Sequence, residues 1–455
     1  MLCLPLTPVV CALSALAVQR LFWLSCAACD CRLARCGLGD IHGFCGVCFF
    51  FKHRRLTPQS SGTSRWCASP LTFDVRHSQV CMKFKMTEMN LEKKRKIVML
   101  ILTENCNLSC VYCFEKAKTK AKMSLQIAKS AVEYELNNSD QFDEIEFDLF
   151  GGEPTLCKPL IQELVEWTND QGFQKPYLFF IDTNGTLVHG QFQDWLIRHK
   201  EYVYVGLSLD GTPETHNINR DNSYDRIDIK FFLKNYPEQP VRMTINSNTI
   251  GTLSKDVIYL HGLGFSSVVA TFAHGIVWDK NKIKNELKEE LYMLCSYYLE
   301  HPEISECSIF DMQLPRILQK EQPIGKWCGT GTSMVSFGVD GTKYPCHTFQ
   351  SNTGAAIKAV KLGEIDFDGI SDFSYHACSS CILEPICPNC YGMNYVTNGH
   401  ILSRDMGLCE IVKVRALAVS YLRAKQLEKN STRMRPNETY QTIAAIEAIQ
   451  SQFTT

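Results

Sequence analysis

The 455-residue sequence has almost no net charge. Its 47 lysines and arginines nearly balance its 48 aspartates and glutamates, which leaves a formal charge of -1 at pH 7. The sequence also lacks a long apolar span free of charges, although 45% of its residues are hydrophobic. These two absences give no basis for a large basic surface or a membrane-spanning helix. We therefore expect an ordinary soluble protein with neither a nucleic acid nor a membrane as partner.

Cysteine, in contrast, is abundant, and three of the 23 cysteines stand close together. Cys106, Cys110 and Cys113 follow the apolar segment 97–102, which is typical of a parallel strand buried on both faces. Thiolate is a soft ligand that favours iron-sulfur clusters and zinc. No fourth cysteine follows before Cys157. Three thiolates at this spacing can hold three irons of a cubane and leave the fourth iron open.

Apolar segments alternate with helical patterns along the chain after this motif. The alternation predicts parallel strands joined by helices, and α/β barrels place their chemistry at the carboxyl ends of such strands. Small polar residues at 182–185, 208–211 and 246–248 could form hydrogen bonds to a cofactor there. Simple turn chemistry explains these residues as well. The six expected strands are 97–102, 147–150, 177–182, 202–208, 241–246 and 267–272.

The three-cysteine loop, together with Gly151-Gly152-Glu153-Pro154, resembles the radical S-adenosylmethionine (SAM) superfamily. The resemblance implies an α/β fold, a partial (β/α)6 TIM-type barrel, in which a 4Fe-4S cluster on Cys106, Cys110 and Cys113 binds SAM. Without its context, a three-cysteine motif fits zinc or chance as well. Arg220 also fits a surface ion pair. The cofactor-binding residues that the resemblance implies are Tyr112, Gly151, Gly152, Glu153, Pro154, Asn184, Ser208 and Arg220.

A second system of seven cysteines lies between Cys328 and Cys409. An odd number of thiols cannot pair off as disulfides, and an iron-sulfur system fits an intracellular chain better. The order of these cysteines resembles the SPASM domain, a small Cys-rich module that carries auxiliary 4Fe-4S clusters. The resemblance implies two auxiliary clusters, one on Cys378, Cys381, Cys387 and Cys409 and one on Cys328, Cys346 and Cys390.

Two departures from that pattern affect this assignment. Only two residues separate Cys387 from Cys390, where the family commonly has three, and no further cysteine follows Cys328 within 329–334. The second set therefore has one iron without a cysteine, which could bind substrate, water or His347. A zinc site is the alternative, and its ligands would be Cys378, Cys381, Cys387 and Cys390.

The segment 205–211 and the following 216–220 resemble the branch of the superfamily that modifies peptides and proteins, including anaerobic sulfatase-maturating enzymes. Those enzymes carry an aspartate after the cysteine that corresponds to Cys346, as the proposed proton acceptor. This chain has His347 there, which can act as a general base near neutral pH.

We therefore expect a radical SAM enzyme that forms an oxidative crosslink, such as a thioether or carbon-carbon bond, in a ribosomally made peptide. Its electron donor would be a small redox protein. Sulfatase maturation, which forms formylglycine, is the alternative. A third hypothesis is a non-enzymatic Cys-rich metal-binding scaffold, which would not require Gly151 to Pro154.

The first residues differ in character from the rest. Residues 1–81 hold ten cysteines without regular spacing, and 8–24 is short for a membrane span and lacks the positive start of a signal peptide. We expect the functional chain to begin near Met82, Met86 or Met89 and to be cytoplasmic, because an oxidising compartment disfavours low-potential clusters. Cys26-x2-Cys29 and Cys45-x2-Cys48 could form a metal site.

The expected organisation of the whole chain is a Cys-rich leader outside the functional fold (1–85), a barrel (92–300), a linker (301–324), a SPASM domain (325–412) and a helical tail (413–455).

Overall fold

The computed structural model describes residues 94–319, 322–353, 365–429 and 434–453. The expected leader 1–85, with its paired cysteines, lies outside the described residues, so no structural statement is made about it.

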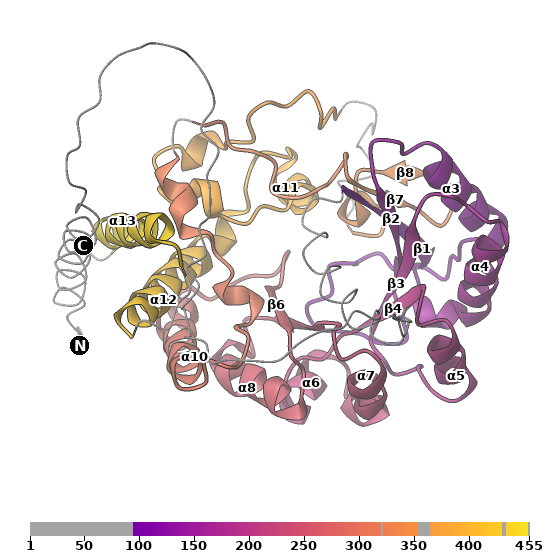
Figure 1. The fold of residues 1–455 in the computed structure, drawn as a ribbon, viewed down its shortest axis with the longest axis horizontal. Helices are drawn as coiled ribbons and strands as arrows, with labels where there is room; N and C mark the ends of the chain where they lie inside the picture. Colours follow the sequence, from indigo (N-terminus) through magenta and orange to yellow (C-terminus); the bar gives the residue numbers. More distant parts are fainter. Residues whose placement is uncertain (1–93, 320–321, 354–364, 430–433, 454–455) are drawn as a thin grey trace, which may run out of the picture. The chain divides into compact units, whose positions relative to one another are not determined.

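Each of the six apolar segments forms a strand, and these strands line one side of the barrel's helices (Figure 1). In the first strand, residues 98–102 are all buried, in accordance with their continuous apolar sequence. The strands are β1 (Arg95–Thr103), β2 (Glu144–Gly151), β3 (Tyr177–Thr183), β4 (Val203–Leu207), β5 (Val241–Ile245) and β6 (Val268–Phe272).

Strands β1 to β4 are parallel neighbours in one sheet, and β5 pairs with β6 in parallel. A parallel bridge between Ser208 and Arg242 continues the order from the end of β4 to β5. The strands therefore follow one another around an open barrel, and the prediction of a partial (β/α)6 barrel is confirmed.

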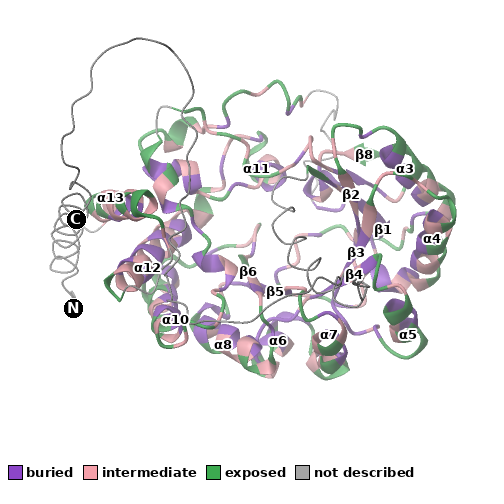
Figure 2. Cartoon of the chain, in the orientation of Figure 1, coloured by how far each residue is buried: buried purple, intermediate pink, exposed green. Residues whose placement is uncertain are grey.

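Helices join the strands and cover the outside of the sheet. Their apolar residues turn toward the strands: α4 (Lys158–Asp170), for example, buries Ile161, Leu164 and Val165. Figure 2 shows buried residues along the strands and on the facing sides of the helices. The other helices of this part are α3 (Leu125–Asn137), α5 (Gln191–Arg198), α6 (Pro213–Asn219), α7 (Ile229–Asn235), α8 (Leu253–Leu263), α9 (Lys280–Lys282) and α10 (Lys288–Glu300).

The sheet continues into the segment that was expected to form the SPASM domain. Strand β7 (Met334–Phe337) lies parallel to β1 on the side away from β2, and β8 (Lys343–Tyr344) pairs antiparallel with β7. The sequence did not predict this pairing, because four residues carry too little periodicity to identify a strand. Because β8 runs antiparallel to β7, the chain after β8 returns toward the start of β7, where the Gly331 amide donates to the Pro345 carbonyl at 2.9 Å. Cys346 therefore lies beside the start of β7, whereas the first cysteine loop follows the end of β1.

The remaining helices are α11 (Tyr391–Asn398), α12 (Cys409–Glu428) and α13 (Pro436–Phe453). Helix α12 crosses the expected boundary at residue 412 and is tied to the end of the barrel, where both Arg423 Nη atoms contact the Glu306 carboxylate at 2.6 Å. Helix α13 begins at Pro436, since proline is well tolerated in the first turn of a helix. Among the described residues, no helix has the length and apolarity needed to cross a membrane.

Candidate active site

A cavity of about 570 Å³ lies at the carboxyl ends of the barrel strands. Its walls come from the first cysteine loop, from the ends of the strands and from His347, Cys390 and Met393 of the C-terminal part. Pro154 lies outside this wall, at the start of a 3-10 turn that runs to Cys157. The sequence-predicted residues that line the cavity are Cys106, Cys110, Tyr112, Cys113, Gly151, Gly152, Glu153, Asn184, Ser208, Arg220, His347 and Cys390.

The three thiols of the first loop lie within electrostatic reach of one another. Burial, together with the charges of Asp210, Cys106 and Cys113 and against that of Arg220, raises the pKa of the Cys110 thiol to about 11. A thiol with this pKa is neutral at pH 7 until a cationic group displaces its proton. Three converging soft ligands at the mouth of a large cavity fit an iron-sulfur cluster.

Gly151 and Gly152 are required by the close approach of β2 to the cysteine loop. A Cβ atom would lie 2.2 Å from the Thr103 carbonyl oxygen at Gly151 and 2.3 Å from the Asn105 carbonyl oxygen at Gly152. Gly151 also has φ +135°, which disfavours any other residue. The Gly152 amide donates to the Thr103 carbonyl at 2.9 Å, and the Glu153 amide donates to the Asn105 carbonyl at 3.0 Å. The glycine pair therefore holds the cysteine loop against the sheet.

Glu153 is buried and connects the ends of β2 and β3. Its carboxylate accepts hydrogen bonds from Thr183 Oγ1 at 2.6 Å and from the Asn184 amide at 2.8 Å. Asn184 Nδ2 in turn donates to Asn107 Oδ1, on the cysteine loop, at 2.9 Å. Burial raises the pKa of Glu153, and these donors lower it. The carboxylate thus orients Asn184 toward the loop.

Arg220 is buried rather than placed at the surface. Its Nε atom lies 3.0 Å from Asp210 Oδ1, and its guanidinium stands over the Tyr112 ring at 5.5 Å. The Tyr112 hydroxyl donates to Asp210 Oδ2 at 2.6 Å. The sequence analysis named Asp210 only within the polar residues 208–211 and not as the partner of Arg220. Asp210 fixes Tyr112 and Arg220 at the cavity wall.

His347 faces the cavity among apolar side chains. Its ring packs against Phe114 and Phe150, and its Nδ1 atom lies 3.1 Å from Met99 Sδ. Burial lowers the pKa of His347 to about 4, and the charge of Arg242 lowers it further. The imidazole is therefore neutral at pH 7 and is a weaker base than an ordinary histidine. Its role as a general base stays a prediction.

The cavity also contains charged residues, of which the sequence analysis named only Asp182, among the polar residues 182–185. Asp148 of β2 and Asp182 of β3 line it together with Arg242 of β5, whose Nε atom lies 2.9 Å from Asp182 Oδ1. Burial raises the pKa of Asp148 and of Asp182, and their neighbouring carboxylates add to both effects. The signal was the period-two alternation of β2, which places Glu146 and Asp148 on the face opposite Ile145 and Phe147.

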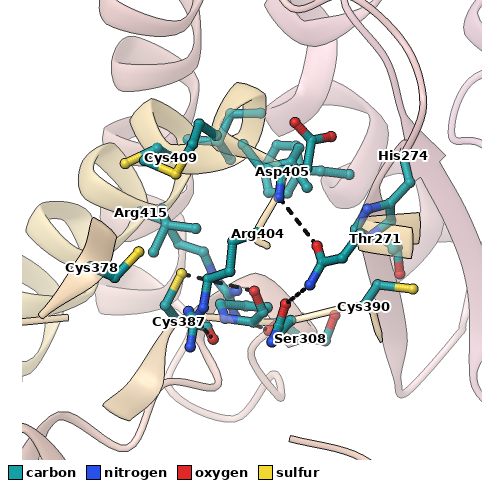
Figure 3. Close-up of a pocket in the computed structure, with 18 of the residues that line it drawn as sticks. Thr271, His274, Ser308, Cys378, Cys387, Cys390, Arg404, Asp405, Cys409 and Arg415 are labelled. Atoms are coloured by element: carbon teal, nitrogen blue, oxygen red, sulfur yellow. Dashed lines mark hydrogen bonds between the residues drawn. The ribbon is translucent and has the colours of Figure 1, made fainter. Parts of the chain in front are cut away.

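The C-terminal cysteines gather in two sets, and the first surrounds a smaller cavity of about 210 Å³ (Figure 3). Burial raises the pKa of the Cys378 thiol, which also interacts with Cys381 and Cys409. Burial raises the pKa of Cys387 to about 11, and the charges of Cys378 and Cys409 contribute. These four residues are the set that the resemblance implied.

The second set contains Cys328, Cys346 and Cys390. Burial, with smaller contributions from the charges of Cys346 and Cys328, raises the pKa of the Cys390 thiol to about 12. Thr348 Oγ1 lies 3.0 Å from Cys346 Sγ. Cys390 interacts electrostatically with this set, although it also borders the smaller cavity. Among the described residues, no three His, Cys, Asp or Glu side chains have the spacing required around a single metal ion.

Comparison with known proteins identifies the barrel. Residues 100–231 match the family model of the radical SAM superfamily. An uncharacterized protein of Methanocaldococcus jannaschii is 31% identical over 182 residues, which is 38% of this chain and 61% of the relative. The Cys-type anaerobic sulfatase-maturating enzyme of Clostridium perfringens ATCC 13124 is 26% identical over 269 residues, which is 54% of this chain and 72% of the relative.

The solved structure of native anSMEcpe with bound AdoMet and Kp18Cys peptide has the same fold. It is 21% identical with a TM-score of 0.58, and the match covers 74% of this chain and 99% of that one. The family model shows that residues 100–231 carry a radical SAM domain, and the fold agrees with this assignment. Within that class, the chain is similar to the anaerobic sulfatase-maturating enzymes.

Proposed function

We propose that this enzyme cleaves SAM reductively and uses the resulting radical to oxidise a side chain of a ribosomally made peptide, forming a thioether or carbon-carbon crosslink. The observation that carries this proposal is the large cavity, whose walls include the three thiols of the first loop and residues next to the auxiliary cysteines. A barrel wall closed by a second group of cysteines provides the enclosure that radical chemistry requires.

Cys106, Cys110 and Cys113 would hold a 4Fe-4S cluster whose open iron binds SAM. With SAM bound and the cluster reduced, the site would supply a 5'-deoxyadenosyl radical that abstracts a hydrogen atom from an unactivated carbon. The protein holds the loop through Gly151 and Gly152. The other residues in contact range of SAM on the cavity wall would be Tyr112, Glu153, Asn184, Ser208 and Arg220.

The residues around His347 would determine the polarity of the cavity where a substrate binds. Met99, Phe114 and Phe150 surround the imidazole with apolar groups, which exclude water from this part of the cavity. A neutral His347 can accept a hydrogen bond from the substrate without adding charge. Cys390, on the same wall, belongs to the set that would carry one auxiliary cluster. A small redox protein would supply the electrons, and the cytoplasm would keep the clusters reduced.

Sulfatase maturation is the second candidate, because the clostridial relatives carry that name. The described cavity supports it in one respect. No carboxylate follows Cys346, but Asp148 and Asp182 line the same cavity as His347, and burial raises the pKa of both, which makes each a stronger base than an ordinary aspartate. The two candidates differ in the atom oxidised and share the peptide class of substrate.

The test is anaerobic. The full chain, loaded with iron and sulfide and then reduced, is expected to convert SAM to 5'-deoxyadenosine, whereas Cys110→Ala is expected to reduce the amount formed at least 100-fold. Cys157→Ala is the matched control, because Cys157 is buried beside the Leu102 carbonyl and belongs to none of the three sets. Equal product from wild type and Cys110→Ala would reject the proposal. Mass spectrometry of added peptides then separates a crosslink from formylglycine.

A further inference from the structure

Arg404 occupies an unusual place beside the first auxiliary set of cysteines. The residue is 7% exposed, and it lines the cavity that Cys378, Cys387 and Cys409 also line. In Figure 3 its side chain lies among the labelled cysteines, next to Arg415. Sequence reasoning gave Arg404 no role.

The guanidinium of Arg404 has little to compensate its charge among protein groups. Its Nη1 atom donates to the Cys387 carbonyl at 3.2 Å, and its Nε atom is buried without a hydrogen-bond partner. Among the residues that the structure describes, no carboxylate forms an ion pair with it. A buried cation without a counter-charge is unfavourable, so the site is built for an anion.

The neighbouring Arg415 is bound differently. Its Nη2 atom donates to the Ser308 carbonyl at 2.9 Å and to the Asp311 carbonyl at 3.2 Å, and its Nε atom donates to the Ile309 carbonyl. Those three bonds tie α12 to the barrel. Arg404, in contrast, keeps its buried Nε without an acceptor.

The thiols beside Arg404 would supply the missing counter-charge as ligands of a cluster. Cys378, Cys387 and Cys409 line the same cavity as Arg404, which also donates to the Cys387 carbonyl. Four thiolates around a 4Fe-4S core carry a net negative charge, which increases when the core is reduced.

We propose that Arg404 is a positioning residue that compensates the charge of a 4Fe-4S cluster on Cys378, Cys381, Cys387 and Cys409 and raises its reduction potential. This inference rests on the proposed function, which places a cluster there. A positive charge beside the thiolates stabilises the reduced state more than the oxidised state. Hydrogen bonds to the sulfurs act in the same direction.

The experiment is a redox titration of the fully loaded chain, followed by electron paramagnetic resonance. Cys378→Ala is expected to remove one redox wave, and the wave that disappears is the one that belongs to this cluster. Arg404→Gln is expected to shift that wave to lower potential and leave the other waves in place, and Arg404→Lys, which keeps the charge without the forked donors, is expected to shift it less. Arg435→Gln is the control, because Arg435 is an exposed arginine paired with Glu438.

The outcomes separate this inference from the proposed function. If Cys378→Ala removes neither a redox wave nor iron, the auxiliary cluster is absent and the inference fails, whereas the proposed function is judged by the Cys110→Ala comparison. A wave that is present and keeps the same potential in Arg404→Gln would overturn the inference alone. Loss of this wave from an Arg404→Gln chain with wild-type unfolding supports it, since the cluster then requires the charge. If Arg404→Gln unfolds, the potential of Arg404→Lys decides.

Discussion

At the scale of single residues, the interior of the active site is organised by charges that are almost removed from water. Arg220 and Asp210 form a buried ion pair at 3.0 Å, and Tyr112 and Asn219 both donate to the second oxygen of Asp210. A buried pair is costly to break, because removal of one partner leaves the other charge uncompensated. The position of Tyr112 next to the cysteine loop therefore depends on Arg220.

We expect Arg220→Gln to lower the free energy of unfolding by about 3 to 5 kcal/mol, because the Asp210 carboxylate would lose its counter-charge. Urea unfolding at pH 7 measures this change. The matched control is Arg226→Gln, an exposed arginine six residues later, for which a change within about 0.5 kcal/mol is expected. Equal changes in the two variants would show that the pair contributes no stability.

At the scale of secondary-structure elements, one glutamate joins helix α3 to two strands. Glu135 is fully buried and accepts from Lys96 of β1 at 2.5 Å and from Lys343 of β8 at 2.7 Å. Burial alone would raise the pKa of Glu135, but hydrogen bonds from Lys343 and Lys96 lower it below the ordinary value of 4.5. The glutamate thus connects the barrel to the hairpin that leads into Cys346.

Glu135→Gln is expected to lower the free energy of unfolding by about 3 kcal/mol at pH 7, because two lysines lose their counter-charge. Since the folded pKa is lowered, this stabilisation is complete above pH 4.5 and disappears as the pH falls through the folded value. Urea titrations at pH 7 and in steps below pH 4.5 should show the two proteins converging. Glu133→Gln, an exposed change on the same helix, should have no such effect. A pH-independent difference would contradict the assignment.

The secondary-structure elements also show which parts of the fold could be predicted from the sequence alone. The six barrel strands were predicted because each is a long or strongly patterned apolar segment, and the cysteine loop was predicted because its spacing carries specific chemistry. Strand β7 was missed because Met334 to Phe337 has no resolvable period. Arg404 was missed for another reason, and Asp210 was named only within the polar residues 208–211, without its ion pair. The importance of both residues comes from burial beside groups far away in the chain, which no local pattern records.

At the scale of the whole molecule, the structure gathers the described cysteines into three sets and leaves three others apart. Cys157, Cys295 and Cys307 are buried within the apolar core. The two C-terminal sets interact within themselves, with Cys378 beside Cys381 and Cys409, and Cys328 beside Cys346. Separate sets should load iron separately, because each would hold its own cluster.

Iron content per chain therefore tests the arrangement. After anaerobic loading, Cys378→Ala and Cys328→Ala are each expected to lose about four irons relative to the wild type, one 4Fe-4S cluster's content. The double variant is expected to lose about eight, because groups in independent sites add. Cys295→Ala, which removes a core thiol near the Ala418 carbonyl, should keep the full iron content.

A single zinc site would give a different pattern: Cys378→Ala would remove zinc rather than iron, and Cys328→Ala would change neither the zinc nor the iron content. A double variant that loses no more than one single variant would mean that Cys328 and Cys378 serve one shared site, and the assignment of Cys390 to the second set would then be wrong.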